Sequence, residues 1–470
     1  MSDKAGFKQS RMVRDRQGAT YQLTEKLAEG GQGIVCKTEY PNVLVKISHR
    51  PAGDSKASAW YQQIQWVSRL DLDGLNIARP QTLIVDPRPG YVMELMEGLI
   101  PLQGLVDESF EAMMDGAGLV GFINSGGLSR RLRILSSLAT TLAKLHGRGL
   151  AYGDLSPSNV FVSRSIEHSE VWLIDCDNLS LFCRDGLNNV YTPDYGAPEV
   201  VKGEQGIDSL SDSWSFAVIA FQLLTLQHPF KGDLVNDGEP EIEESALGGG
   251  LPWIDHPSDD SNRSSHGLPR EFMLTKRLRA LFEQCFNAGR DLKENRPTLS
   301  DWREAFDEAV MALLYCEEED GCQSSFYVNN DFQCPFCDRI KAKETAVVLT
   351  HFLFSYTSDE ELRALPEYSP WLRTGHVQLV SKQPVELRNS PIGTAAYWES
   401  DRICELKLSD DGLHITSEDD RSVFIQRPSD NKLLPIKGTK RLANTLRQDE
   451  LYVIHLGDPA ETHYCWRFRW

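Results

Sequence analysis

Short apolar runs separated by turn residues dominate the chain between residues 21 and 97. Runs that are rich in β-branched residues and bounded by Gly, Pro, Asn or Asp are typical of strands. Four such runs stand at 33–36, 43–47, 82–85 and 91–95. The segment 57–70 differs, because Trp60, Ile64 and Val67 recur at nearly the helical period of 3.6 residues. The pattern therefore predicts a small β-rich lobe that contains one helix.

Helical patterns take over from about residue 128. One apolar stripe joins Leu132, Leu135, Leu138, Leu142 and Leu145. The segment 216–226 is apolar almost all round, which suits a buried helix, and a last helix is expected at 299–314. Residues 231–269 are instead rich in Gly, Ser, Asp and Glu, which is typical of a long surface insertion. We therefore expect a helical lobe over 98–314 with one acidic insertion.

The remainder of the chain, from about residue 346 to 470, returns to short alternating segments. Strands are predicted at 377–380, 405–408, 423–425 and 451–456. Several short strands at this spacing are typical of an all-β, sandwich-like domain. The region has no recognisable catalytic constellation, so we expect it to serve docking or regulation.

The net charge and the cysteine content indicate which partners and which cellular compartment to expect. A formal net charge of −19 over 470 residues argues against a general binder of nucleic acid or anionic membranes, which would need clustered Lys and Arg. Residues 1–20 form a polar tail without the apolar core of a secretory signal, and 216–226 is too short to span a bilayer. Ten cysteines without an export signal favour a reducing compartment. We therefore expect a cytoplasmic protein with no nucleic-acid and no membrane partner.

A glycine-rich turn precedes a lysine in the predicted β-lobe. Gly30, Gly31 and Gly33 lie between two predicted strands, where backbone N–H groups can approach phosphate oxygens without an intervening Cβ. Lys46 follows on a strand between two apolar neighbours, so its ammonium points to the other face of the sheet. Taken singly, the turn suits an ordinary hairpin and the lysine suits a solvated edge charge. Their order and spacing favour a phosphate site.

Two polar segments follow in the helical lobe. The sequence Asp-Leu-Ser-Pro-Ser-Asn at 154–159 comes between the leucine-rich helix and an apolar strand. These residue types also favour a simple capped turn. The sequence Asp-Cys-Asp-Asn at 175–178 ends a second apolar strand, where a merely solvated pair of acids is unusual.

Together these segments resemble the protein kinase family, in the right order and over about two thirds of the chain. The Tyr-Thr-Pro-Asp-Tyr-Gly-Ala-Pro-Glu sequence at 191–199 resembles the end of a kinase activation loop and distinguishes protein kinases from small-molecule kinases. The resemblance implies an α+β, bilobal fold with an N-lobe over 21–97 and a C-lobe over 98–314. It also implies ATP and Mg²⁺ as cofactors and Ser/Thr of protein substrates as phosphate acceptors.

The resemblance assigns roles to individual residues. Asp154 would orient the substrate hydroxyl and accept its proton, while Asn159 and Asp175 would hold Mg²⁺, a metal that Asp177 could share. The predicted catalytic residues are thus Asp154, Lys46, Asn159 and Asp175. The predicted nucleotide-binding residues are Gly30, Gly31, Gly33, Val35, Lys46, Glu94 and Met96.

The resemblance implies that four further residues support the site. Thr192 would contact the catalytic aspartate, and Glu199 would form a buried pair with Arg296. Asp212, ahead of the apolar helix, would brace the backbone of the catalytic loop. The simpler alternatives are a solvated surface acid for Glu199 and a helix N-cap for Asp212.

The chain also departs from the family pattern. Where the family has a helical glutamate that pairs with the lysine, the matching residue is Gln63, so we expect a weaker latch on Lys46 or an acid from elsewhere, such as Glu29. Gly153 replaces the arginine before the catalytic aspartate, which argues against control by activation-loop phosphorylation. Ser156 replaces a lysine that contacts the γ-phosphate. Leu44 replaces a small alanine of the adenine pocket, and Ala28 replaces the first loop glycine.

These departures leave two hypotheses. The first is a Ser/Thr protein kinase that is slow or conditionally active, since the groups that phosphoryl transfer can least lose are present. The alternative is a pseudokinase that binds nucleotide as a signalling scaffold. The chain is similar to a divergent bacterial branch of the family that accompanies a von Willebrand A-domain protein and a metal-dependent phosphatase, which we expect as partners beside the protein substrate.

Four cysteines cluster after the predicted C-lobe, within 315–342. They are Cys316, Cys322, Cys334 and Cys337. Two pairs at this spacing are typical of zinc sites, and four thiolates would fill the tetrahedral coordination of a structural Zn²⁺. The alternatives are reduced cysteines in a small core, or a redox pair at Cys334 and Cys337. We predict a zinc ribbon here, because so short a segment needs a staple to fold.

Overall fold

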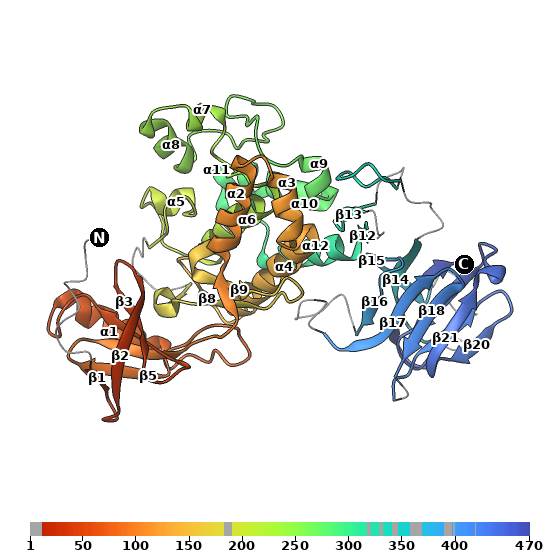
Figure 1. The fold of residues 1–470 in the computed structure, drawn as a ribbon, viewed down its shortest axis with the longest axis horizontal. Helices are drawn as coiled ribbons and strands as arrows, with labels where there is room; N and C mark the ends of the chain where they lie inside the picture. The colour runs from red at the N-terminus through yellow and green to blue at the C-terminus, as the bar shows by residue number, and fades with distance from the viewer. Residues whose placement is uncertain are drawn as a thin grey trace.

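The computed structural model describes residues 12–182, 190–316, 321–328, 332–340, 346–357, 369–389, 397, 400–418 and 420–470. In Figure 1 the N-terminal β-lobe and the C-terminal β-rich region lie at opposite ends of the molecule, with the helical lobe between them. The arrangement in space thus follows the order along the chain.

Six strands of the N-lobe form a closed barrel in the order β1-β2-β3-β4-β6-β5. They are β1 (Met12–Asp15), β2 (Thr20–Glu29), β3 (Gly33–Thr38), β4 (Val43–Ser48), β5 (Thr82–Asp86) and β6 (Gly90–Glu94). Helix α1 (Ser55–Val67) begins at Asp54, whose side chain accepts hydrogen bonds from two backbone N–H groups of the first turn. The four predicted strands and the predicted helix thus match β3 to β6 and α1.

Strand β1 corrects one expected boundary. We predicted a polar tail over 1–20, but Met12–Asp15 pairs with both β2 and β5 and closes the barrel. Val13 is 2% exposed and packs into the barrel core. A single buried apolar side chain between two exposed residues gives no periodicity that a sequence pattern can detect. Residues 1–11 lie outside the described part of the chain.

Two long buried helices form the centre of the C-lobe. They are α4 (Gly127–His146), which carries the predicted leucine stripe, and α6 (Ser209–Thr225), which is buried almost all round. Around them lie α2 (Leu102–Met114), α3 (Gly118–Asn124), α5 (Pro198–Val201), α9 (Arg270–Met273), α10 (Lys276–Glu283), α11 (Gly289–Asp291) and α12 (Leu299–Met311). Two small sheets that border the N-lobe consist of β7 (Leu99–Pro101), β8 (Leu150–Ala151), β9 (Val160–Ser163), β10 (Val171–Leu173) and β11 (Ser180–Leu181).

The acidic segment 231–269 is anchored to the C-lobe more firmly than a surface insertion. It contains α7 (Asp233–Asn236) and α8 (Pro240–Leu247). Asn262 is fully buried, and its amide donates to the carbonyls of Phe230 (3.0 Å) and Pro252 (2.8 Å). Trp253 is also buried, at 2% exposure. The polar composition indicated exposure, but two buried side chains hold the segment against the lobe.

The chain beyond the C-lobe is β-rich. A hairpin of β12 (Leu313–Tyr315) and β13 (Ser325–Tyr327) comes first. A six-stranded antiparallel sheet follows, in the order β15-β14-β23-β22-β19-β20, and a four-stranded sheet in the order β16-β17-β18-β21. The strands are β14 (Val347–Phe354), β15 (Trp371–Val380), β16 (Val385–Arg388), β17 (Arg402–Ser409), β18 (Gly412–Ser417), β19 (Phe424–Arg427), β20 (Lys432–Pro435), β21 (Gly438–Ala443), β22 (Leu451–His455) and β23 (His463–Arg469).

The two larger sheets share one apolar core. Leu349 and Trp466 of the first sheet and Leu406 and Ile415 of the second are all fully buried in it. Met311, at the end of α12, belongs to the same core. The β-rich region therefore packs directly on the C-lobe. Among the helices that the structure describes, none has the length and apolar character needed to cross a membrane.

Candidate active site

Lys46 lies on β4, and its side chain is 5% exposed. Its Nζ forms one ion pair with Oδ1 of Asp175 and another, 3.0 Å long, with Oδ2 of Asp177. Burial lowers the pKa of Lys46, but the charges of Asp177 and Asp175 outweigh burial, so the net shift is upward. The ammonium is therefore charged and held between two carboxylates.

Asp175 follows β10 with φ at 57°, a left-handed conformation that is uncommon for a residue with a side chain. The N–H of Ile174 donates to the carbonyl of Asn159 at 3.0 Å, which brings Asn159 next to this turn. Burial and the charge of Asp177 raise the pKa of Asp175 to about 7, although Lys46 lowers it. A divalent cation would favour the charged carboxylate, so the donors fit the Mg²⁺ predicted for Asp175 and Asn159.

Asp154 lies in the loop between β8 and β9 and is fixed from three sides. Its Oδ1 accepts a hydrogen bond from Thr192 Oγ1 at 2.7 Å, and its carbonyl accepts one from Asn159 Nδ2 at 2.8 Å. Asp212, at the start of α6, accepts hydrogen bonds from the backbone N–H groups of the two residues before Asp154, at 2.7 and 2.9 Å. The contacts expected of Thr192 and Asp212 are thus both present.

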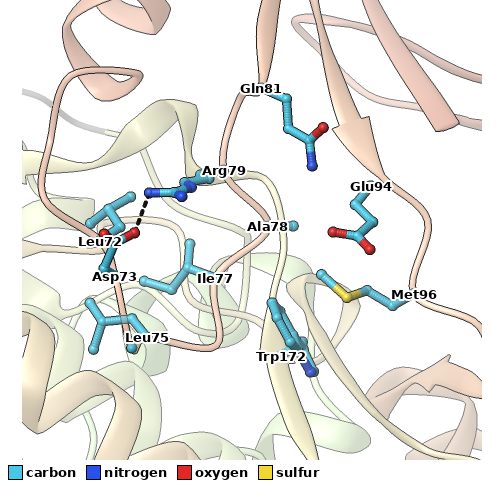
Figure 2. A pocket seen from close by; sticks show the side chains of 11 residues that line it. Leu72, Asp73, Leu75, Ile77, Ala78, Arg79, Gln81, Glu94, Met96 and Trp172 are labelled. Carbon is cyan, nitrogen blue, oxygen red and sulfur yellow. Dashed lines mark hydrogen bonds and ion pairs between the residues drawn. The ribbon is translucent and has the colours of Figure 1, made fainter. Parts of the chain in front are cut away.

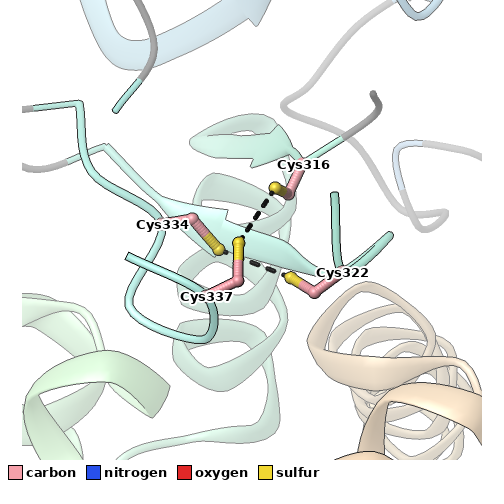
Figure 3. Close-up of side chains that lie close together, drawn as sticks. All are labelled: Cys316, Cys322, Cys334 and Cys337. Carbon is pink, nitrogen blue, oxygen red and sulfur yellow. Dashed lines mark hydrogen bonds between the residues drawn. The ribbon is translucent and has the colours of Figure 1, made fainter. Parts of the chain in front are cut away.

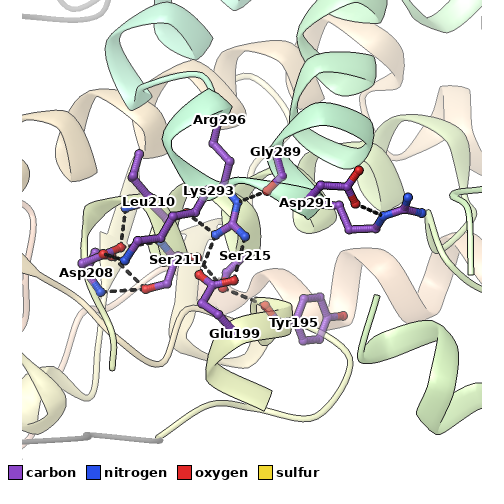
Figure 4. A network of polar contacts seen from close by, with 11 residues as sticks. Tyr195, Glu199, Asp208, Leu210, Ser211, Ser215, Gly289, Asp291, Lys293 and Arg296 are labelled. Carbon is purple, nitrogen blue, oxygen red and sulfur yellow. Dashed lines mark hydrogen bonds and ion pairs between the residues drawn. The ribbon is translucent and has the colours of Figure 1, made fainter. Parts of the chain in front are cut away.

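Glu199 of α5 forms the predicted buried pair with Arg296 (Figure 4). The guanidinium donates twice to the carboxylate, at 2.8 and 2.7 Å, and a third time to the carbonyl of Gly289 at 2.8 Å. It also lies 4.9 Å from the ring centroid of Trp214 on α6. This bidentate pair ties the segment after Thr192 to the core of the C-lobe.

The three loop glycines have different reasons to be glycine. A Cβ on Gly30 or Gly31 would meet no atom within 4 Å, so the space around them is open for a ligand. A Cβ on Gly33 would lie 2.3 Å from the carbonyl oxygen of Ile47. Gly33 is therefore required for the close pairing of β3 with β4, a role that the sequence alone did not indicate.

Glu94 and Met96 lie where β6 leads toward the C-lobe. Their side chains line a cavity of about 250 Å³ (Figure 2). Ala78, Gln81 and Trp172 also line it. The intervening Leu95 packs instead against a cluster that contains Leu44 and Met93, as expected for side chains that alternate along an extended chain. A nucleotide on the Leu44 side would therefore meet the backbone of residues 94 and 96 rather than their side chains.

Comparison with known proteins agrees with this geometry. The family model described as "Protein kinase domain" matches residues 21–304, which is more than half of the chain. The chain belongs to the protein kinase family. All the residues predicted for phosphoryl transfer lie within the matched part.

The relatives of this kinase include bacterial and eukaryotic members. Serine/threonine-protein kinase pkn2 of Myxococcus xanthus is 32% identical over 130 residues, which are 26% of this chain and 16% of the relative. Pkn1 of the same organism is 25% identical over 231 residues, which are 46% of this chain and 30% of the relative. Myosin light chain kinase A of Dictyostelium discoideum is 26% identical over 236 residues, 48% of this chain and 72% of the relative. The matched parts of the chain therefore span less than a third of the length of the two Myxococcus proteins.

The partner of Lys46 differs from the one we expected. The side-chain amide of Gln63 donates a hydrogen bond to the backbone carbonyl of Leu179 at 2.7 Å. Glu29 forms an ion pair with Lys26. The acid comes from Asp177, which stands where the family's Asp-Phe-Gly has its glycine. Sequence showed Asp177 only as a second acid near the metal. Its bond to Lys46 joins residues 131 positions apart, and no local pattern reports such a contact.

The backbone conformation at position 153 favours glycine. Its φ is 91°, and a Cβ would lie 2.3 Å from Cδ1 of Ile207. A side chain at this position would be strained by the positive φ, and Ile207 would have to shift to make room for it. The missing arginine is therefore part of how the loop before Asp154 packs, and Ser156, three residues further on, is 1% exposed.

The four clustered cysteines meet as predicted (Figure 3). Their sulfurs all lie within 4.8 Å of one another, with Cys316 to Cys337 at 3.5 Å and Cys322 to Cys334 at 3.6 Å. A tetrahedral Zn²⁺ with Zn–S bonds of about 2.3 Å requires sulfurs about 3.8 Å apart. The donors therefore fit a zinc ion in number, chemistry and spacing.

Proposed function

We propose that this chain is an ATP- and Mg²⁺-dependent protein kinase that phosphorylates Ser/Thr of protein substrates, with a slow or conditional rate. One observation carries the proposal. Lys46 pairs with Asp175, and Ile174, the residue before Asp175, is hydrogen-bonded to Asn159. Asn159 and Thr192 in turn both donate to Asp154. Phosphoryl transfer needs a phosphate cation, metal ligands and a hydroxyl acceptor in one place, and little else from the protein.

The groups have separate tasks in this proposal. Lys46 holds phosphate oxygens of ATP, and Asn159 and Asp175 hold Mg²⁺, which neutralises phosphate charge when bound. Thr192 occupies Oδ1 of Asp154, so Oδ2 is the oxygen that accepts the proton of the substrate hydroxyl. The absence of a lysine at Ser156 removes one cation from the transferred phosphate, which supports a reduced rate.

Radiolabelled ATP tests this proposal against the scaffold alternative. The chain is incubated with γ-labelled ATP, Mg²⁺ and casein, and phosphoamino-acid analysis identifies the labelled residues. We expect label on Ser or Thr of casein or of the chain itself, abolished in Asp154→Asn, while both proteins still bind ATP. Nucleotide binding without any transfer in the wild type would instead establish the scaffold.

We further propose that the four cysteines hold a structural Zn²⁺ in a ribbon that supports the C-lobe. The hairpin that carries the site is attached to α4, because Ser325 Oγ accepts a hydrogen bond from the N–H of Ser129 at 3.0 Å and Tyr315 donates to Ser129 Oγ at 2.9 Å. Elemental analysis should find one zinc per chain, lost in Cys334→Ser. A chain that is free of zinc and folds normally would contradict this proposal.

The β-rich region is proposed as a docking or regulatory domain of a cytoplasmic kinase. Its attachment to the end of α12 supports a fixed position relative to the substrate site: Gln378 Nε2 donates to the carbonyl of Met311 at 3.3 Å. The partners inferred from sequence resemblance are a von Willebrand A-domain protein and a metal-dependent phosphatase. Co-purification from the source cells, with and without residues 346–470, would test this, and equal recovery from both would refute the docking role.

A further inference from the structure

Two side chains of helix α1 in the N-lobe form hydrogen bonds with the segment after β10 in the C-lobe, residues 175–179. Trp60 Nε1 donates to Oδ2 of Asp177 at 2.6 Å, and one helical turn later Gln63 Nε2 donates to the carbonyl of Leu179 at 2.7 Å. Lys46 donates to the same Oδ2 of Asp177 at 3.0 Å. A single carboxylate oxygen of Asp177 therefore accepts hydrogen bonds from both helix α1 and Lys46.

The carboxylate of Asp177 is buried, so its charge needs a nearby opposite charge. Its side chain has no exposed surface, and that of Lys46 is 5% exposed. Removing one member of a buried ion pair leaves an uncompensated charge, which is strongly unfavourable. Without Asp177, Lys46 would have Asp175, a predicted metal ligand, as its remaining carboxylate partner within the described contacts.

Asp175 and Asp177 differ in burial, and this difference suits them to different roles. Mg²⁺ usually keeps several waters, so its protein ligands need access to the open side of the site. The side chain of Asp175 is 30% exposed, whereas that of Asp177 is completely buried. Oδ2 of Asp177 already accepts hydrogen bonds from Trp60 and Lys46. Asp175 therefore suits the metal and Asp177 suits the lysine.

The geometry points to Asp177 as the positioning residue that holds Lys46 for ATP, with Trp60 as its anchor on helix α1. The inference rests on the proposed function, because it assigns how the phosphate cation of that site is held. In this arrangement the helix acts on Lys46 through Trp60 and Asp177 rather than through an acid of its own. A displacement of α1 would release Asp177 and with it the lysine.

Two variants test the inference on the full chain. Asp177→Asn keeps the volume and removes the charge, and Trp60→Phe keeps a ring and removes the N–H. We expect Asp177→Asn to raise KM for ATP about tenfold and to lower kcat, with a smaller effect of the same kind from Trp60→Phe. The free Mg²⁺ concentration that gives half the maximal rate at saturating ATP should stay unchanged. Because the two residues act in series, the double variant should be no worse than Asp177→Asn alone.

Matched controls are Asp449→Asn and Trp371→Phe, which make the same changes in the β-rich region. If Asp177→Asn raises the Mg²⁺ requirement as Asp175→Asn does, Asp177 is a metal ligand and the inference is wrong. Unchanged KM for ATP in both variants would also overturn it. Direct ATP titration by calorimetry separates this from the proposed function: a wild type without transfer activity refutes the kinase proposal, whereas tenfold weaker ATP binding by Asp177→Asn still supports the role of Asp177.

Discussion

The pair of Glu199 and Arg296 allows a stability effect to be worked out from the structure. The side chains are 12% and 0% exposed, and two hydrogen bonds of 2.8 and 2.7 Å join them. Glu199→Gln keeps the shape of the side chain but leaves the guanidinium without its counter-charge. Arg296 would retain the carbonyl of Gly289 and the ring of Trp214. Because these neutral contacts cannot replace a charge, we expect the free energy of unfolding to fall by about 3 kcal/mol.

Urea denaturation followed by tryptophan fluorescence measures this loss as a shift of the midpoint at constant slope. The neighbouring Asp291, drawn in Figure 4, is 70% exposed and pairs with Arg290, so Asp291→Asn serves as the control. That variant should change stability by less than about 0.5 kcal/mol. A loss below 1 kcal/mol for Glu199→Gln, or equal losses in the two variants, would refute the reasoning that burial makes this pair costly to break.

Three further predictions concern other parts of the chain. Gly153→Arg should lower the melting temperature and abolish activity rather than restore regulation, because the residue has φ at 91° and faces Ile207; a stable, active variant would contradict this. A strong chelator that removes zinc at neutral pH should lower the melting temperature of the wild type but not that of Cys334→Ser, as differential scanning fluorimetry would report. Burial lowers the pKa of His351 to about 3 and that of His376 to about 4. Histidines in the unfolded chain have a pKa near 6.5, so the unfolded chain takes up protons first as pH falls. Each of the two histidines should therefore lower the free energy of unfolding by about 2 kcal/mol at pH 5. An unchanged urea midpoint on going from pH 7 to pH 5 would exclude this.

Residues whose role is tied to a local motif could be predicted from the sequence. Asp154 and Asn159 stand at a fixed short spacing, and so do Thr192 and Glu199. The contacts expected of them from the resemblance to protein kinases are present in the structure. The cysteine site is similar, since paired thiols at such spacings have few other uses.

Contacts that depend on packing between distant elements could not be predicted in the same way. The bond of Trp60 to Asp177 crosses from the N-lobe to the C-lobe, and Trp60 appeared in sequence only as one apolar position of an amphipathic helix. The need for glycine at 153 arises from its φ of 91°, which is a property of the folded loop. Neither feature leaves a periodic or compositional signal.

The central claim is that the connected groups around Asp154 transfer phosphate. The most direct measurement is the single-turnover rate of γ-phosphate transfer from Mg²⁺-ATP to a Ser/Thr peptide library, for the wild type and Asp154→Asn at saturating nucleotide. The account predicts measurable transfer by the wild type and a rate at least about 100-fold lower for the variant, as expected when a general base is lost. Equal rates, or no transfer by a wild type that binds ATP, would contradict it.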